Sequence, residues 1–185
     1  MFQYLRALCI SILNHKYIQK PELHQDIIRF CNNKLVKNSL DKTVRHLLVK
    51  NPAFSTVYHM RIKQYNRIHG KLTSLIFPPK TDCHLDVKEI GAGLIIYHGN
   101  ASVIFAEKIG ENCSIYQQVT LGRGKINEGR SIPIIGDNVN IYAGAIVVGG
   151  ITIGNNVSIG AGAVVNKDIP DNCTVVGNPF RIIQH

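Results

Sequence analysis

Several common signals are missing from this sequence of 185 residues. No stretch approaches the ~20 consecutive apolar residues that a membrane-spanning helix needs. The apolar run at the start, MFQYLRALCISILNHKY, is interrupted by Arg6 and has no small-residue cleavage site, so it predicts an amphipathic helix and not a signal peptide. The five cysteines are odd in number, well separated and without a CxxC pair. This usage predicts a reducing, cytoplasmic compartment, no disulfide framework and no structural zinc.

Acidic residues are scarce in the first part of the chain. Residues 1–80 hold 14 Lys and Arg against 3 Asp and Glu, giving +11, whereas residues 81–185 hold 7 against 9, giving −2. This asymmetry indicates either an anionic partner or a solvated helical surface. RGG, RNP and zinc-finger patterns are absent, so nucleic acid is not expected as a partner. A peripheral membrane contact through basic N-terminal helices remains open.

What is present in residues 1–80 is the pattern of a helical domain. Residues 21–38 open on a proline, which suits a first helical turn, and they group Ile27, Ile28, Cys31 and Leu35 on one side. Residues 39–51 open on Ser39, a candidate cap, and group Val44, Leu47 and Leu48. Pro52 begins another helical segment, and the pair Pro78–Pro79 predicts the end of the domain.

After the prolines the period changes to six. Single aliphatic residues recur at this spacing at Ile90 and Ile96, at Val103, Ile109, Ile115 and Leu121, and at Ile135, Ile141, Val147, Ile153, Ile159 and Val165. Corner sequences such as IGEN, IGDN and IGNN lie between them. A gap of six fits neither a helix nor a simple sheet, but it does fit a solenoid with one inward residue per flat strand. The polar stretch 122–134 interrupts the array and is expected to be an extruded loop.

This array resembles the hexapeptide repeat of the left-handed β-helix acyltransferases, and within them the serine acetyltransferases. The stretches GAGLIIYHGNASVI, CSIYQQVTLGRGK and VVGNPFRII carry the likeness. The resemblance implies an α+β fold, with a helical domain over 1–80, a left-handed parallel β-helix of about four coils over 81–170, and a C-terminal tail over 171–185. It also implies a homotrimer that uses acetyl-CoA as co-substrate, with no metal.

By this resemblance His98 is the general base. It follows Ile96 by two residues, so it is expected to face outward from the narrow solenoid. Imidazole ordinarily has a pKa of about 6.5, which suits the removal of a proton from an attacking hydroxyl. The family places an orienting carboxylate upstream, and Asp82 is the match, although its spacing to Ile90 is one residue longer than the family pattern. Asp86 is the alternative.

The resemblance further implies a site for acetyl-CoA along a subunit seam. Small residues match the positions where the pantetheine arm passes, namely Gly122, Ala143, Gly144 and Ala161. Lys167 and Arg181 are candidates to meet the phosphates. For each glycine, plain corner geometry is an equally good interpretation.

The acceptor site departs from the family pattern. Tyr97 stands where an acidic residue precedes the catalytic histidine, and Ser131 and Ile132 stand in place of an Arg–His pair, with Arg130 one residue earlier. A zwitterionic acceptor is disfavoured, because the charged groups that would bind it are replaced. A sugar of a cell-surface polysaccharide or its precursor is therefore the first expectation for the hydroxyl acceptor. Serine O-acetylation for cysteine biosynthesis is the alternative. A non-catalytic scaffold that binds a membrane or a partner is the third hypothesis.

Overall fold

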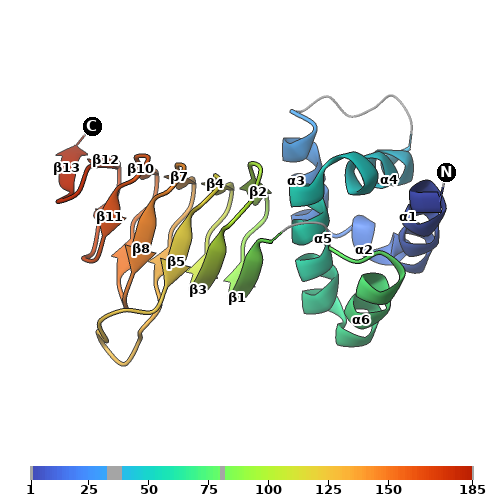
Figure 1. Ribbon diagram of the computed structural model, residues 1–185, viewed down its shortest axis with the longest axis horizontal. Coiled ribbons are helices and arrows are strands. Elements are labelled where there is room, and N and C mark those ends of the chain that lie inside the picture. The colour runs from blue at the N-terminus through green and yellow to red at the C-terminus, as the bar shows by residue number, and fades with distance from the viewer. Residues whose placement is uncertain (1, 33–38, 80–81, 185) are drawn as a thin grey trace. The chain divides into compact units, whose positions relative to one another are not determined.

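The computed structural model divides the chain into two compact units, Met1–Thr81 and Asp82–His185. Residues 2–32, 39–79 and 82–184 are described by the structure. Figure 1 shows that the first unit consists of helices and the second of stacked strands. The expected α+β class, with helices followed by a parallel β-solenoid, is confirmed.

The helical unit contains α1 (Phe2–Leu13), α2 (His15–Ile18), α3 (Pro21–Phe30), α4 (Leu40–Lys50), α5 (Pro52–Tyr65) and α6 (Arg67–Ile76). The helix expected over 21–38 ends early, at Phe30, because Asn32 adopts a left-handed φ of 50° that ends the helical path. Leu35, expected on its apolar face, lies outside the described residues. Ser39 precedes α4 as expected, but its side chain makes no capping hydrogen bond.

Helix α5 forms the centre of this unit. Its residues from Ala53 to Ile62 are all buried, and Phe54, Tyr58 and Ile62 join the apolar core. The predicted cluster of Val44, Leu47 and Leu48 on α4 is buried in the same core. Arg61, also on α5, lies inside the unit and pairs with Asp26 of α3 through two hydrogen bonds of 2.7 and 3.1 Å.

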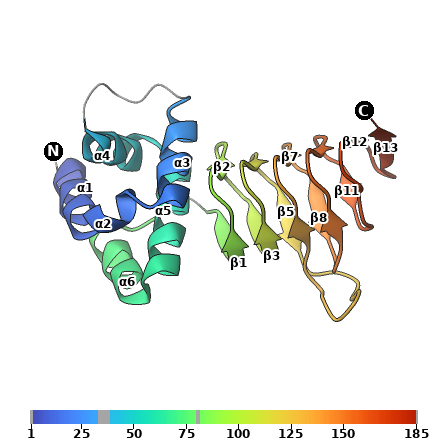
Figure 2. The ribbon, with the colours of Figure 1, turned by 180° about the vertical axis from the view of Figure 1, so that it is seen from behind.

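The second unit contains thirteen strands among the described residues. They are β1 (His84–Ile90), β2 (Ile95–Ile96), β3 (Val103–Ile109), β4 (Ser114–Ile115), β5 (Thr120–Gly122), β6 (Ile134–Ile135), β7 (Asn140–Ile141), β8 (Ile146–Val148), β9 (Thr152–Ile153), β10 (Ser158–Ile159), β11 (Val164–Val165), β12 (Cys173–Val176) and β13 (Arg181–Gln184). Parallel pairing between successive coils builds three faces, seen from the front in Figure 1 and from behind in Figure 2.

Each face carries one column of inward aliphatic residues. Face A stacks Leu85, Ile104, Leu121, Val147 and Val165. Face B stacks Ile90, Ile109, Ile135, Ile153 and Ile169. Face C stacks Ile96, Ile115, Ile141, Ile159 and Val175. Five members per column make about five coils, one more than the four expected from the sequence.

The predicted inward position at Val103 is wrong. Ile104 is the buried residue that pairs with Leu121, while Val103 is only partly buried. The reason is an insertion before the strand. Eight positions separate Ile96 from Ile104, whereas six separate Ile115 from Leu121, so the first turn from face C to face A holds two extra residues.

The turns between faces form three edges, named here by the faces that they join. Along edge BC, Asn112, Asn138, Asn156 and Asn172 all have φ between 55° and 58°. The side-chain amide of Asn138 donates to Asn156, and that of Asn156 donates to Asn172, at 3.1 and 2.9 Å. This asparagine ladder ties the later coils together. Edge AB carries the loop 123–133, which projects from the solenoid in Figures 1 and 2.

Beyond the last regular coil, β12 still pairs in parallel with β10, and β13 then runs antiparallel to β12. Face C therefore extends to Val176, and β13 forms the final strand of its sheet.

Candidate active site

His98 lies in the two-residue insertion on edge CA. Its φ is 65°, and the Gly99 amide donates to the Tyr97 carbonyl at 2.8 Å, so His98 is the central residue of a three-residue turn. A non-glycine residue in this conformation carries backbone strain of the kind that gathers at functional sites. The side chain is exposed, as the sequence predicted. In the sequence, the insertion corresponds to the longer spacing around YHGN.

Edge CA aligns this turn with the small residues expected to contact acetyl-CoA. Backbone hydrogen bonds of 3.0 Å connect successive turns, from Gln118 N–H to Asn100, from Gly144 N–H to Gln117, and from Gly162 N–H to Ala143. His98, Ala143, Gly144 and Ala161 therefore lie along one edge, in the first, third and fourth coils. Gly144 has a φ of 71°, so corner geometry by itself favours a glycine there.

The two candidate carboxylates lie differently. His84 pairs with Val103, and its amide donates to Ser102 at 2.9 Å, so the residues just before β1 continue edge CA. Asp82 therefore lies at the same edge as His98. Asp86 pairs with Phe105 on β3, two residues further along the strand than His84. Within the described part of the chain, neither carboxylate is hydrogen-bonded to His98.

The remaining predicted residues lie at edge AB and at the C-terminal end of face C. Gly122 ends β5 at edge AB, where its carbonyl accepts from Gly149 at 3.1 Å. Lys167 follows β11 at this same edge. Arg181, in β13, pairs with Val176 of β12 at the end of face C. A single chain thus separates Gly122 and Lys167 from His98 by the width of face A.

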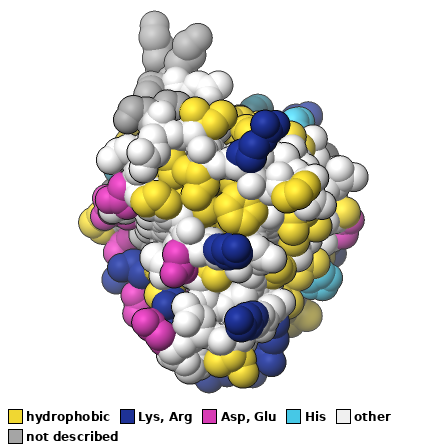
Figure 3. All heavy atoms as spheres, turned by 90° about the vertical axis from the view of Figure 1, so that its left-hand side faces the viewer, with side chains coloured by type: hydrophobic (Ala, Val, Ile, Leu, Met, Phe, Trp, Pro, Cys, Tyr) yellow, Lys and Arg dark blue, Asp and Glu magenta, His cyan; other side chains and the backbone are white. Residues whose placement is uncertain are grey.

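Lys167 also lines a hollow at the C-terminal end of the solenoid. The hollow has a volume of about 640 Å³, and its lining includes Asn166, Asp168, Asn178 and Phe180. Figure 3 looks onto this end, where hydrophobic side chains gather beside Lys and Arg side chains. The lining combines an aromatic ring, two amides, a cation and a carboxylate.

The acceptor-loop residues belong to edge AB as well. Arg130 closes the loop through paired backbone hydrogen bonds with Asn127, both 2.9 Å, and Ser131 accepts from Gly124 at 2.9 Å. Arg130, Ser131 and Ile132 are each half-buried. The loop is therefore ordered by its own backbone, but it leaves the solenoid one face away from His98.

Two polar atoms near these edges are buried without a hydrogen-bond partner in the described part of the protein. They are Nη1 of Arg130, whose other terminal nitrogen lies 3.7 Å from Glu128, and Oε1 of Gln117 on edge CA. Such atoms are rare in folded proteins, because burial without a partner is costly. One is a cationic donor and the other an acceptor. Sequence reasoning missed Gln117, which only the three-dimensional edge connects with His98.

Tyr97 begins a row of stacked phenols. Its ring lies 4.6 Å from that of Tyr116, which lies 5.1 Å from that of Tyr142. Burial, followed by the neighbouring Tyr97 and Tyr142, raises the pKa of Tyr116. Tyr97, in place of the acidic residue that the family resemblance implies, therefore belongs to an aromatic row.

Cys83 is a further residue close to Asp82 that sequence reasoning did not single out. Burial raises the pKa of its thiol to about 11, with a further contribution from the Asp82 carboxylate. A thiol with this pKa is neutral near pH 7 and is a poor nucleophile. Direct acyl transfer by this cysteine is therefore disfavoured. Among the described residues, no group of three or more His, Cys, Asp or Glu could hold a metal ion.

Residues 132–167 match the family model described as bacterial transferase hexapeptide (six repeats). Serine acetyltransferase from Staphylococcus xylosus is 50% identical over 97 residues, which are 52% of this chain and 45% of that protein. Serine acetyltransferase from Synechococcus elongatus is 41% identical over 95 residues, 51% of this chain and 39% of that protein. The chain thus spans less than half of the length of these curated relatives.

Solved structures extend the similarity to the helical unit. Neisseria gonorrhoeae serine acetyltransferase has a TM-score of 0.65 at 28% identity, covering 98% of this chain and 72% of the other. The soybean enzyme complexed with serine has a TM-score of 0.62 at 29% identity, covering 91% and 72%. A serine acetyltransferase complex with CoA shares the fold, with a TM-score of 0.62 at 24% identity over 98% and 83%. In its repeats and its fold, this chain is similar to the serine acetyltransferases and to the hexapeptide-repeat transferases.

Proposed function

We propose that this chain is an acetyl-CoA-dependent O-acetyltransferase in which His98 is the general base. The observation that carries the proposal is the placement of His98 in an exposed, inserted turn on edge CA, in line with Ala143, Gly144 and Ala161. A hydroxyl is a weak nucleophile without a base within hydrogen-bond reach. The relative with a bound CoA supports acetyl-CoA as the donor.

In the proposed reaction, the His98 imidazole takes the proton of the acceptor hydroxyl while its oxygen attacks the thioester carbonyl. A C–O bond forms, and the C–S bond then breaks. His98 returns the proton to the departing thiolate, so that free CoA and an acetyl ester are the products. Asp82 is proposed to orient the imidazole and to stabilise its charged form.

For the acceptor we propose L-serine. The relatives are named serine acetyltransferases, and the soybean structure is a complex with serine. The comparisons do not support the sugar that the sequence departures favoured. A sugar stays a second candidate on one observation, the stacked Tyr97, Tyr116 and Tyr142 beside His98.

The proposed site is shared between subunits. His98 lies on edge CA, while Arg130 and Lys167 lie on edge AB, one face away. In a homotrimer, edge CA of one copy can meet edge AB of the next, which brings base, acceptor loop and phosphate-binding cations together. This arrangement explains why one chain holds all the predicted residues but does not gather them.

The test is the rate of CoA release from acetyl-CoA with L-serine and with a panel of sugars, measured with a thiol reagent. We expect turnover with serine that disappears in His98→Ala. Turnover with a sugar but not with serine would move the assignment to the second candidate. Failure of the chain to bind acetyl-CoA would reject the enzyme altogether and favour a scaffold.

A further inference from the structure

The outer side of α1 carries an uncovered apolar stripe. Phe2, Leu5 and Ile12 are 66%, 56% and 68% exposed, and Leu8 between them is also exposed. Their spacing of three and four residues puts them on one side of the helix, opposite Ala7 and Ile10, which are fully buried. A soluble surface normally keeps such residues apart, so a continuous stripe indicates an interaction.

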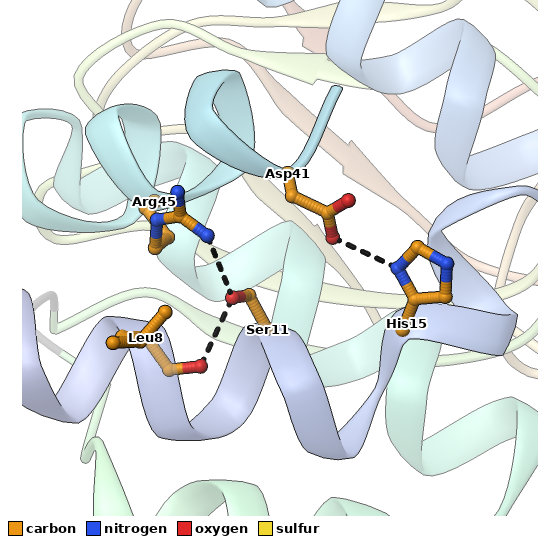
Figure 4. A network of polar contacts seen from close by, with 5 residues as sticks. All are labelled: Leu8, Ser11, His15, Asp41 and Arg45. Carbon is orange, nitrogen blue, oxygen red and sulfur yellow. Dashed lines mark hydrogen bonds and ion pairs between the residues drawn. The ribbon is translucent and has the colours of Figure 1, made fainter. Parts of the chain in front are cut away.

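Polar contacts hold the inner side of α1 against α4. Figure 4 shows Ser11 donating to the Leu8 carbonyl at 3.0 Å while it accepts from Arg45 of α4 at 3.5 Å. Nearby, Nδ1 of His15 lies 3.0 Å from the Asp41 carboxylate. These contacts fix the rotation of α1, so its apolar stripe stays outward.

Helix α6 carries a second apolar stripe. Ile68 and Leu75 are 70% and 80% exposed, and Leu72 lies between them on the same side. Asn14, directly after α1, donates to Thr73 of α6 at 2.8 Å, and the two helices pack together. The helical unit therefore presents two apolar stripes to solvent, on two helices that pack together.

Cations border the α6 stripe. Lys63, Arg67 and Lys71 line a hollow of about 350 Å³ between α5 and α6, together with Gly70 and Ser74. A Cβ atom on Gly70 would lie 2.7 Å from the Lys63 Cα, so this glycine allows the close approach that brings the cations together. Across the described residues, none of the three cations forms an ion pair with a carboxylate.

We propose that α1 and α6 form a docking surface for anionic lipid membranes. Apolar side chains beside unpaired cations are the combination that binds the boundary between lipid headgroups and acyl chains. The charge of the N-terminal part, 14 Lys and Arg against 3 Asp and Glu, complements such a surface. The same charge opposes a second copy of this chain as the occupant, because two such units repel each other. Within the described helices none is long and apolar enough to span a bilayer, so the contact is peripheral.

The experiment measures partition of the full chain onto phosphatidylcholine vesicles with and without phosphatidylserine, by co-sedimentation at low and high salt. We expect binding only to the anionic vesicles, weakening as salt screens it. Lys71→Glu should lower the partition coefficient at least about fivefold, and Leu75→Glu should lower it similarly. Lys42→Glu, the same charge change at an exposed position of α4, is the matched control and should change it less than about twofold.

Absence of binding to anionic vesicles at low salt would overturn the proposal, as would equal losses in Lys71→Glu and Lys42→Glu. Light scattering then measures the oligomeric state of the variants. If Leu5→Glu and Leu75→Glu change the oligomeric state and leave vesicle binding intact, the surface binds a second copy and the proposal is wrong. Circular dichroism of each variant confirms folding. Vesicle binding is measured without acetyl transfer to serine, so the result of this test does not depend on the proposed activity.

Discussion

The amide of Gly99 donates a hydrogen bond to the carbonyl of Tyr97 at 2.8 Å, which holds His98 at the tip of a strained, exposed turn. The histidine side chain contributes nothing to the aliphatic interior of the solenoid. His98→Ala should therefore keep the fold and acetyl-CoA binding while kcat falls by about 10² to 10⁴, the usual contribution of a positioned general base. The measurements are CoA release and calorimetric binding of acetyl-CoA.

His84→Ala is the control for this substitution, since His84 is an exposed histidine at the start of β1. It should retain nearly full activity. Retention of a tenth of the activity by His98→Ala would show that His98 is an ordinary surface residue.

Substitutions of the two candidate carboxylates should have different effects on kcat. Asp82→Asn should lower kcat less than His98→Ala does, because the carboxylate orients the base and does not accept the proton. Asp86→Asn should change kcat little, since Asp86 pairs with Phe105 away from edge CA. Steady-state kinetics across pH would check this. Equal losses in both variants, or a loss in Asp86→Asn alone, would reassign the orienting group.

Hybrid oligomers test whether the site is shared. His98→Ala removes the base at edge CA, and Arg130→Ala removes the loop cation at edge AB. Each variant alone should be nearly inactive. Mixed subunits, unfolded and refolded together, should regain activity, because some interfaces then combine an intact base with an intact loop. A mixture no more active than its components would place the whole site within one chain.

Cys83 gives a pH-dependent prediction. Burial and then Asp82 raise its pKa to about 11 from the ordinary 9.0, so the thiol stays neutral over a wider pH range in the folded protein. The raised pKa adds stability that is complete below pH 9.0 and is lost as the pH rises towards 11. Iodoacetamide should label Cys83 slowly at pH 8 and faster near pH 11, as peptide mass spectrometry would show. Exposed Cys9 is the internal control, and equal rates at pH 8 would contradict the prediction.

The buried pair in the helical unit predicts a stability difference. Arg61 and Asp26 are 1% and 0% exposed, so Asp26→Ala leaves a buried cation without its carboxylate and should cost about 3–5 kcal/mol of unfolding free energy. His15→Ala breaks the more exposed pair with Asp41 and should cost at most about 1 kcal/mol. Urea titration of both variants measures these losses of unfolding free energy. Similar losses would mean that the burial of the first pair is not what stabilises it.

The solenoid could be predicted from the sequence because each strand is specified by residues that are close together in the chain. One aliphatic residue every six positions is enough to specify an inward column, and the predicted inward positions from Ile109 to Val165 are as expected. The prediction failed where the spacing changes, at Val103 after the inserted turn and at Ile169, which follows Val165 by only four residues. The fifth coil was missed because three inward residues, Leu85, Ile169 and Val175, lie outside the regular six-residue spacing.

The site was less accessible to sequence reasoning. His98 could be found from its outward position and the likeness to known repeats. Its relation to Gln117 depends on how one coil stacks on the next, and its relation to Arg130 depends on which edge each turn occupies. Both relations become apparent only when the turns are assigned to edges in the folded solenoid.

The asparagine ladder on edge BC also determines how the solenoid tolerates damage. Asn138, Asn156 and Asn172 pass hydrogen bonds from coil to coil, and each coil contacts only the one before it and the one after it. A stack of this kind has nearest-neighbour cooperativity, so a local defect loosens the adjacent coils and leaves distant ones intact. Fraying then starts at β13, the terminal strand, and reaches the turn that holds His98 last. His98 is thus insulated from opening at the C-terminal end of the chain.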